Sequence, residues 1–166
     1  MQVSFGERGF RNGIFVWAVI GAISYWVLPW FAFEYGLFDA TMDEYWDSLG
    51  WKNHPVSLYL PFFLLLFIPI CWLKRSREVQ GRLFVTLALV TALLLSADFI
   101  YSGRSMGLGT GVILIVLASL FSYGIARLGF LQGDVFISGA VTVVILIIFV
   151  FVFYPVSQVF YKVLVT

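Results

Sequence analysis

The feature that most constrains this chain is a series of long apolar stretches with almost no charged residue. Residues 12–33, 55–73, 105–126 and 135–161 contain no Asp, Glu, Lys or Arg, and residues 83–101 contain one charge, Asp98. A helix needs roughly 20 apolar residues to cross about 30 Å of hydrocarbon, so each stretch is about long enough to span a bilayer. The stretches are continuously apolar rather than alternating, which indicates helices and not membrane-spanning strands.

The composition supports a membrane location. Hydrophobic residues make up 61% of the 166 residues and charged residues only 11%, whereas a soluble domain carries about 25% charged residues. We therefore predict an all-α polytopic integral membrane protein with about five transmembrane helices. A net charge of +1 argues against a nucleic-acid partner, because phosphate binding needs a concentrated basic surface. The predicted spans are residues 14–33, 56–73, 83–101, 107–126 and 135–155.

The distribution of basic residues predicts the orientation of the chain. Of the ten Lys and Arg residues, most fall in the N-terminal segment and in the second and fourth connections: Arg8, Arg11, Lys74, Arg75, Arg77, Arg82 and Arg127. The other side receives Lys52, Arg104 and Lys162. The positive-inside rule then places the N-terminus in the cytoplasm and the C-terminus outside. The first apolar run is longer than the core of a signal peptide, about 7–15 residues, so we expect it to be retained as a span.

Asp98 is the acidic residue inside a predicted span, and buried carboxylates in membranes often mark functional sites. It falls in the last turn of its span, where it can reach interfacial water or pair with Arg104. We favour this structural interpretation, and a transport or proton-transfer role is the alternative.

The first external connection, EYGLFDATMDEYWDSLGWKNHPVS (residues 34–57), is the most polar part of the chain. Thr41 and Glu44 fit a capping box at the start of a helix, and Gly50 is a suitable helix end. We predict a short amphipathic helix on the outer membrane surface, with Trp and Tyr at headgroup depth. The alternative is a metal contact, although the spacing matches no known site. The possible ligands are Glu34, Asp39, Asp43, Glu44, Asp47 and His54.

No residue in the sequence is predicted to be catalytic, cofactor-binding or metal-ligating, and we do not expect an enzyme. His54 and Cys71 are the single histidine and the single cysteine, and they fall at opposite membrane faces, whereas zinc sites need several such ligands. The GLGTG run at 107–111 lacks the strand that precedes a phosphate loop. The spacing of Gly103, Gly107 and Gly111 instead favours close helix contact. Helix bends are expected at Pro29, Pro61, Pro69 and Pro155.

Three stretches in order resemble a known family: WVLPWFAFEYGLFD (26–39), LFIPICWLKRSREVQGRLFVTLALV (66–90) and GDVFISGAVTVVILIIFVFVFYPVSQVFY (133–161). They are similar to the N-terminal portion of permeases of bacterial binding-protein-dependent ABC importers, of the ferric-iron type. In that group extra hydrophobic spans precede the transport core. The core opens with a helix preceded by Gly-Asp, here Gly133 and Asp134, and ending in an aromatic-aromatic-Pro-Val stretch, here residues 153–156.

The resemblance implies a membrane extension at residues 1–132 and the first core helix within residues 133–166. It also implies an inner-membrane location, a cytoplasmic ATPase, a periplasmic substrate-binding protein and the remainder of a permease as partners, besides the lipid bilayer. The Glu-Ala-Ala-type loop that docks on the ATPase is missing from this sequence. We therefore expect an incomplete permease component that supplies scaffold and pathway-adjacent helices without catalysis or cofactor. The alternative is a small self-contained membrane protein with a structural or assembly role.

Overall fold

A computed structural model describes residues 3–33, 41–53, 59–73, 76–102, 106–130 and 134–148, and almost all of them are helical. The prediction of an all-α fold is confirmed, since the β-pairing in these ranges is limited to two isolated β-bridges, Pro29–Leu49 and Phe31–Met106. The helices are α1 (Val3–Val27), α2 (Met42–Asp47), α3 (Gly50–Asn53), α4 (Leu60–Leu65), α5 (Phe67–Ile70), α6 (Arg77–Ser102), α7 (Leu108–Arg127) and α8 (Val135–Ile148).

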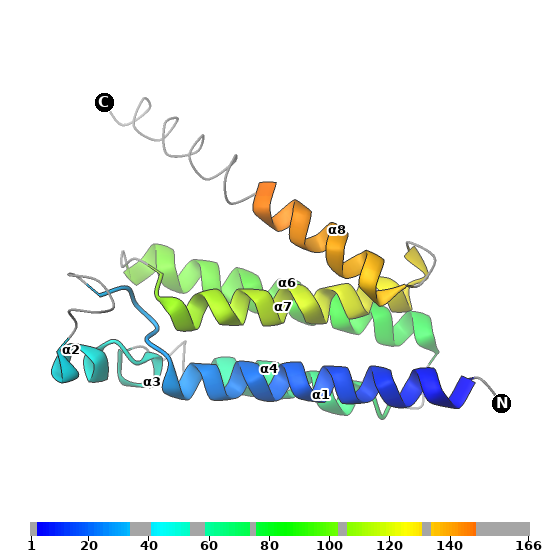
Figure 1. Ribbon diagram of the computed structural model, residues 1–166, viewed down its shortest axis with the longest axis horizontal. Helices are drawn as coiled ribbons and strands as arrows, with labels where there is room; N and C mark the ends of the chain where they lie inside the picture. Colours follow the sequence, from blue (N-terminus) through cyan, green and yellow to red (C-terminus); the bar gives the residue numbers. More distant parts are fainter. Residues whose placement is uncertain are drawn as a thin grey trace.

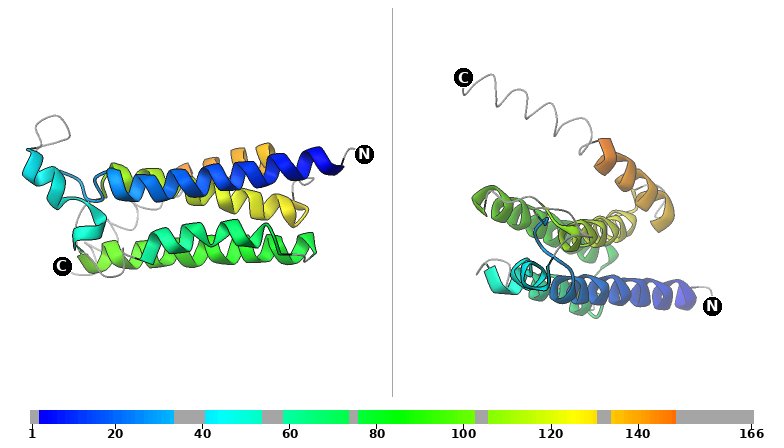
Figure 2. Two further views of the ribbon diagram at one scale, coloured as in Figure 1. Left: turned by 90° about the horizontal axis from the view of Figure 1, so that it is seen from below. Right: turned by 60° about the vertical axis from the view of Figure 1, so that its left-hand side comes forward.

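Among the described residues, α1, the α4–α5 pair, α6 and α7 form a bundle of four rods. Helix α1 lies beside α4 and α5 in one layer, and α6 lies beside α7 in the other, with α1 packed against α7 and α4 against α6 (Figures 1 and 2). Helices α1 and α7 run antiparallel, because Gly21 of α1 meets Val116 of α7 whereas Gly13 meets Tyr123. Helix α8 contacts α7 and leans away from the rest of the bundle (Figure 1).

The core lies between the two layers. Ile14, Leu64, Phe67, Phe84 and Leu120 are fully or almost fully buried there. The rings of Phe67 and Phe84 stack with centroids 5.6 Å apart, which ties α5 to α6. Much of the remaining apolar surface faces outward, as expected when lipid is the solvent.

The first predicted span differs from the helix. Helix α1 ends at Val27 and not near residue 33, and residues 28–33 continue as an extended segment. Pro29 explains the difference, because a proline disfavours the helical conformation of the residue before it. The helix also begins earlier than expected, at Val3.

The second predicted span, 56–73, is not one continuous helix. It is divided at Leu66 into α4 and α5. Pro61 stands in the first turn of α4, where a proline is tolerated. Pro69 lies within α5 and has no N–H to donate to the carbonyl of Leu65, so the regular helical ladder is interrupted.

The later predicted spans correspond closely to helices. Helix α6 covers residues 83–101 and starts one to two turns earlier than predicted, and α7 begins at Leu108, one residue after the predicted start, with Gly107 as its N-cap. Three of the described helices contain segments long and apolar enough to cross a membrane: Gly9–Val27, Arg77–Ala97 and Leu108–Arg127. Helix α8 is a shorter apolar helix, and residues 149–155 of the fifth predicted span lie outside the described residues, as does Pro155.

Close helix packing uses glycines other than the predicted ones. A Cβ on Gly111 would meet nothing within 4 Å, so its predicted packing role is wrong. Gly107 does make a close contact, but with the backbone of Phe31 rather than with a helix. The helix crossings depend on Gly21 against Leu64 and on Gly124 against Phe84. Gly103 lies outside the described residues.

Candidate functional site

One end of the bundle, here called the cap end, is built around the extended segment at residues 28–33. The N–H of Trp30 donates to the carbonyl of Ser48 over 2.8 Å. The Trp30 carbonyl accepts from the N–H of Gly107 at 2.9 Å and from Thr110 Oγ1 at 2.8 Å. The N–H of Gly109 donates to the carbonyl of Pro29 at 2.8 Å. These bonds join the end of α1, the α2–α3 region and the start of α7 into one unit.

Helix α2 begins as the sequence predicts. Thr41 is its N-cap, and its hydroxyl accepts a 3.3 Å hydrogen bond from the N–H of Glu44. The predicted stop at Gly50 is wrong, because the helix ends at Asp47 with Ser48 as its C-cap, and Gly50 begins α3. The N–H and the hydroxyl of Ser48 both bond carbonyls of the last turn, which ends the helix before Gly50 is reached.

The acidic residues of α2 are not gathered into a site. Asp43 is exposed, and Asp47 forms a 3.3 Å ion pair with Lys52. Within the described ranges, no three His, Cys, Asp or Glu side chains are placed to hold a metal ion. Glu34, Asp39 and His54 lie outside those ranges, so the metal alternative for this loop stays untested.

Asp98 lies on α6, near its end at the cap side of the bundle. Its side chain and the whole of Arg104 are outside the described part of the structure, so neither the predicted pairing nor the alternative proton-transfer role is tested.

The opposite end of the bundle, here called the basic end, gathers the described arginines Arg11, Arg77, Arg82 and Arg127. The start of α1, the start of α6 and the end of α7 meet there (Figure 1). The guanidinium carbon of Arg127 lies 3.9 Å from the centre of the Phe10 ring, a cation–π contact that joins α7 to α1. Arg82 pairs with Glu78 one turn away on α6. Lys52, by contrast, lies at the cap end.

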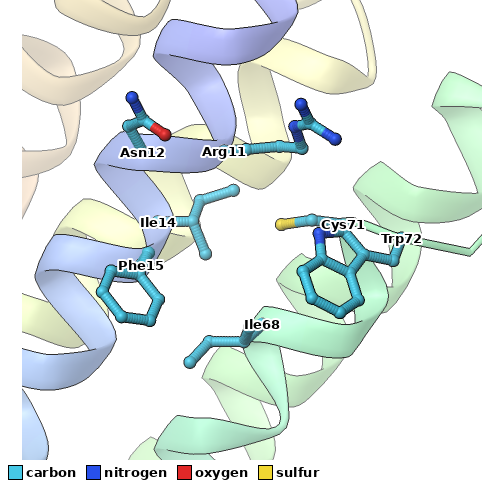
Figure 3. Close-up of a pocket in the computed structure, with 7 residues that line it drawn as sticks. All are labelled: Arg11, Asn12, Ile14, Phe15, Ile68, Cys71 and Trp72. Atoms are coloured by element: carbon cyan, nitrogen blue, oxygen red, sulfur yellow. The ribbon is translucent and has the colours of Figure 1, made fainter.

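A pocket of about 310 Å³ opens at the basic end between α1 and α5. Arg11, Asn12, Ile14, Phe15, Ile68, Cys71 and Trp72 line it. Figure 3 shows the polar groups of Arg11 and Asn12 at one end of the pocket and Phe15 with Ile68 at the other. Sequence reasoning missed this site, because its two walls come from spans that are adjacent only in the folded bundle.

Helix α8 offers an extended apolar surface. Asp134 caps it, since its carboxylate accepts from the N–H groups of Phe136 and Ile137. Ser138 is buried against the bundle, whereas the Phe136 side chain is 82% exposed. Most of the other large apolar residues of α8 are also exposed, namely Ile137, Val141, Val143, Val144, Ile145, Ile147 and Ile148.

These features define an all-α, multi-pass membrane protein with a charged end, a capped end and one outlying apolar helix. Comparison with known proteins shows which class of membrane protein the chain is similar to. The chain is 34% identical over 158 residues, 93% of its length, to the ferric transport system permease protein FbpB of Actinobacillus pleuropneumoniae. It is 30% identical over 114 residues, 68% of its length, to FbpB 1 of Haemophilus influenzae, whose name assigns it the same role provisionally.

The predicted resemblance to ferric-iron permeases is therefore confirmed. The chain spans about a fifth of the length of these relatives, 22% of the first and 18% of the second. No protein-family profile matches the chain, and no solved structure matches it significantly.

Proposed function

We propose that this chain forms a membrane-embedded part of the permease of a bacterial importer for ferric iron. The observation that carries the proposal is the 34% identity, which extends over 93% of the chain and so includes both the bundle and α8. A similarity confined to one apolar span would carry less weight, because unrelated membrane helices share composition.

Within this function we propose two roles for two parts of the chain. Residues 1–132 form a membrane extension whose four rods have their own core between two layers. Residues 133–166 contain α8, which starts the transport core and is pathway-adjacent. The contrast in burial supports this division, since the bundle packs on itself while α8 keeps most of its apolar side chains exposed.

We also propose the setting and the partners. The basic end faces the cytoplasm of a bacterial inner membrane, because positive charge is retained on that side. A cytoplasmic ATPase and a periplasmic substrate-binding protein complete the importer, together with the remainder of the permease. The described helices would contribute a scaffold and part of a path through the membrane, without catalysis.

Uptake of ferric iron tests this function. In the bacterium that carries the chain, with other ferric-iron routes deleted, removal of its coding region should lower accumulation of radioactive ferric iron at least tenfold. Restoring the natural coding region should restore uptake, whereas uptake of an unrelated nutrient should not change. Unchanged ferric-iron uptake in the deletion strain would count against the proposal.

The self-contained core also supports a second candidate, a structural or assembly role without transport. In that case deletion would leave the uptake rate per assembled importer unchanged and would lower only the number of importers in the membrane. Quantifying the partner subunits beside the uptake rate separates the two candidates.

A further inference from the structure

We propose that the pocket at the basic end binds the headgroup of an anionic phospholipid and the first part of one of its acyl chains. The pocket lies between α1 and α5, and Arg11 supplies a cation at its rim (Figure 3). Nothing in this proposal depends on the transported substrate, so it goes beyond the proposed function.

The order of the lining residues matches the order of groups in a phospholipid. Arg11 and Asn12 lie at the outer end of the pocket, where a guanidinium and an amide can donate hydrogen bonds to phosphate and ester oxygens (Figure 3). Phe15 and Ile68 lie one turn further into their spans and form the apolar part. A lipid presents the same sequence of groups from the membrane surface inward.

The pocket also opens where lipid would be. Phe15 is 54% exposed and Trp72 is 73% exposed, so both reach the surface of the bundle rather than its core. Indole rings favour the headgroup region, where the ring contacts chains and the N–H meets polar groups. A volume of about 310 Å³ is at the low end for a ligand site. It therefore accommodates a headgroup and the start of one chain, with the rest of the lipid outside.

The positive charge at the pocket favours an anionic lipid over a zwitterionic one. Arg11 lines the pocket, and the guanidinium of Arg127 lies over the ring of Phe10, the residue before Arg11, so two cations lie at this end of the bundle. Each basic residue near an anionic membrane surface strengthens attraction by about fivefold. A basic pocket between transmembrane helices is a site that anionic headgroups favour.

The single cysteine gives a direct test, because Cys71 lines this pocket and the chain has no other thiol. The whole purified chain is placed in lipid discs of phosphatidylcholine alone or with phosphatidylglycerol, and alkylation of Cys71 by N-ethylmaleimide is timed. We expect phosphatidylglycerol to slow alkylation at least fivefold. In Arg11→Gln the slowing should fall below twofold, and Arg11→Lys, which keeps the charge, should retain most of it.

The matched control is Arg82→Gln, which removes a cation from the same end of the bundle but outside the pocket. It should show the full slowing, which excludes a general effect of surface charge on the thiol. Native mass spectrometry should find one phosphatidylglycerol retained by the natural chain and lost in Arg11→Gln. Equal slowing in Arg11→Gln and the natural chain would overturn the proposal, and so would equal protection by free glycerol phosphate in phosphatidylcholine discs.

Discussion

Thr110 Oγ1 donates a 2.8 Å hydrogen bond to the backbone carbonyl of Trp30, a residue 80 positions earlier in the chain. Both residues are buried, and the bond joins the start of α7 to the extended segment that follows α1. The first span ends where this segment begins, so the geometry of the cap end depends on a contact between distant parts of the sequence.

Replacing Thr110 with Val should weaken the cap end. Valine has nearly the same shape but donates no hydrogen bond, so the free energy of unfolding should fall by about 1 kcal/mol. The loss is not larger because the Trp30 carbonyl keeps its bond from the N–H of Gly107. Unfolding of the purified protein in mixed detergent micelles with increasing SDS measures the change.

Thr91→Val is the control for this experiment. Thr91 is equally buried, but its hydroxyl donates to the Leu87 carbonyl within the same helix. That carbonyl keeps its helical hydrogen bond. Thr91→Val should therefore lower the free energy of unfolding by less than half as much as Thr110→Val. Equal losses in the two variants would show that the Thr110–Trp30 bond has no special role.

Gly124→Ala should disrupt the crossing of α6 and α7. A Cβ at this position would lie 2.9 Å from the Cβ of Phe84 and 3.0 Å from the backbone nitrogen of Val85, so a helix must shift. Overpacking of this kind costs roughly 1–3 kcal/mol. The same unfolding measurement applies.

Gly111→Ala is the matched change on the same helix. Its Cβ would meet no neighbouring atom within 4 Å, and alanine favours a helix over glycine by about 0.5–1 kcal/mol. We expect this variant to be as stable as the natural chain or slightly more stable. If Gly124→Ala is tolerated as well as Gly111→Ala, the close α6–α7 crossing is not required for the fold.

The basic end should face the cytoplasm. In a Cys71→Ser background, Met42→Cys marks the cap end and Ser76→Cys marks the basic end, since both side chains are exposed and neither change alters the charge. A membrane-impermeant maleimide added to cells with a permeabilised outer membrane should label position 42. Position 76 should react only after the inner membrane is opened. Labelling of position 76 alone in intact inner membranes would reverse the proposed orientation.

Alanine substitutions of Phe84 and Phe136 should distinguish a residue needed for folding from a residue needed for assembly. Phe84 is fully buried at the centre of the bundle, so Phe84→Ala should lower the free energy of unfolding by about 3–5 kcal/mol. Phe136 is 82% exposed on α8, so Phe136→Ala should change it by no more than about 0.5 kcal/mol.

If α8 packs against the rest of a transport core, Phe136→Ala should still lower ferric-iron uptake several-fold. Cellular uptake and the unfolding measurement are therefore read side by side. If the Phe136→Ala variant is present at a normal level and still takes up ferric iron at the full rate, the exposed face of α8 no longer supports the proposed function.

The amino-acid sequence by itself determined that this chain is a helical membrane protein, because lipid leaves no alternative for apolar runs of this length. It also determined the gathering of Arg11, Arg77, Arg82 and Arg127 at one end, since consecutive spans must alternate in direction. The Thr41 cap could be predicted because the residues that make it are three positions apart.

Only the tertiary structure decided how those helices pack against one another and what holds the segments between them. Pro29 accounts locally for the end of α1 at Val27, but no local pattern reveals that residues 28–33 are held by hydrogen bonds to Ser48 and Gly107. Gly124 packs closely and Gly111 does not, although both are helical glycines in one span. The pocket beside Arg11 and Cys71 could not be predicted from the sequence either. In each case the deciding contact joins residues far apart in sequence, and their proximity follows from packing several helices at once.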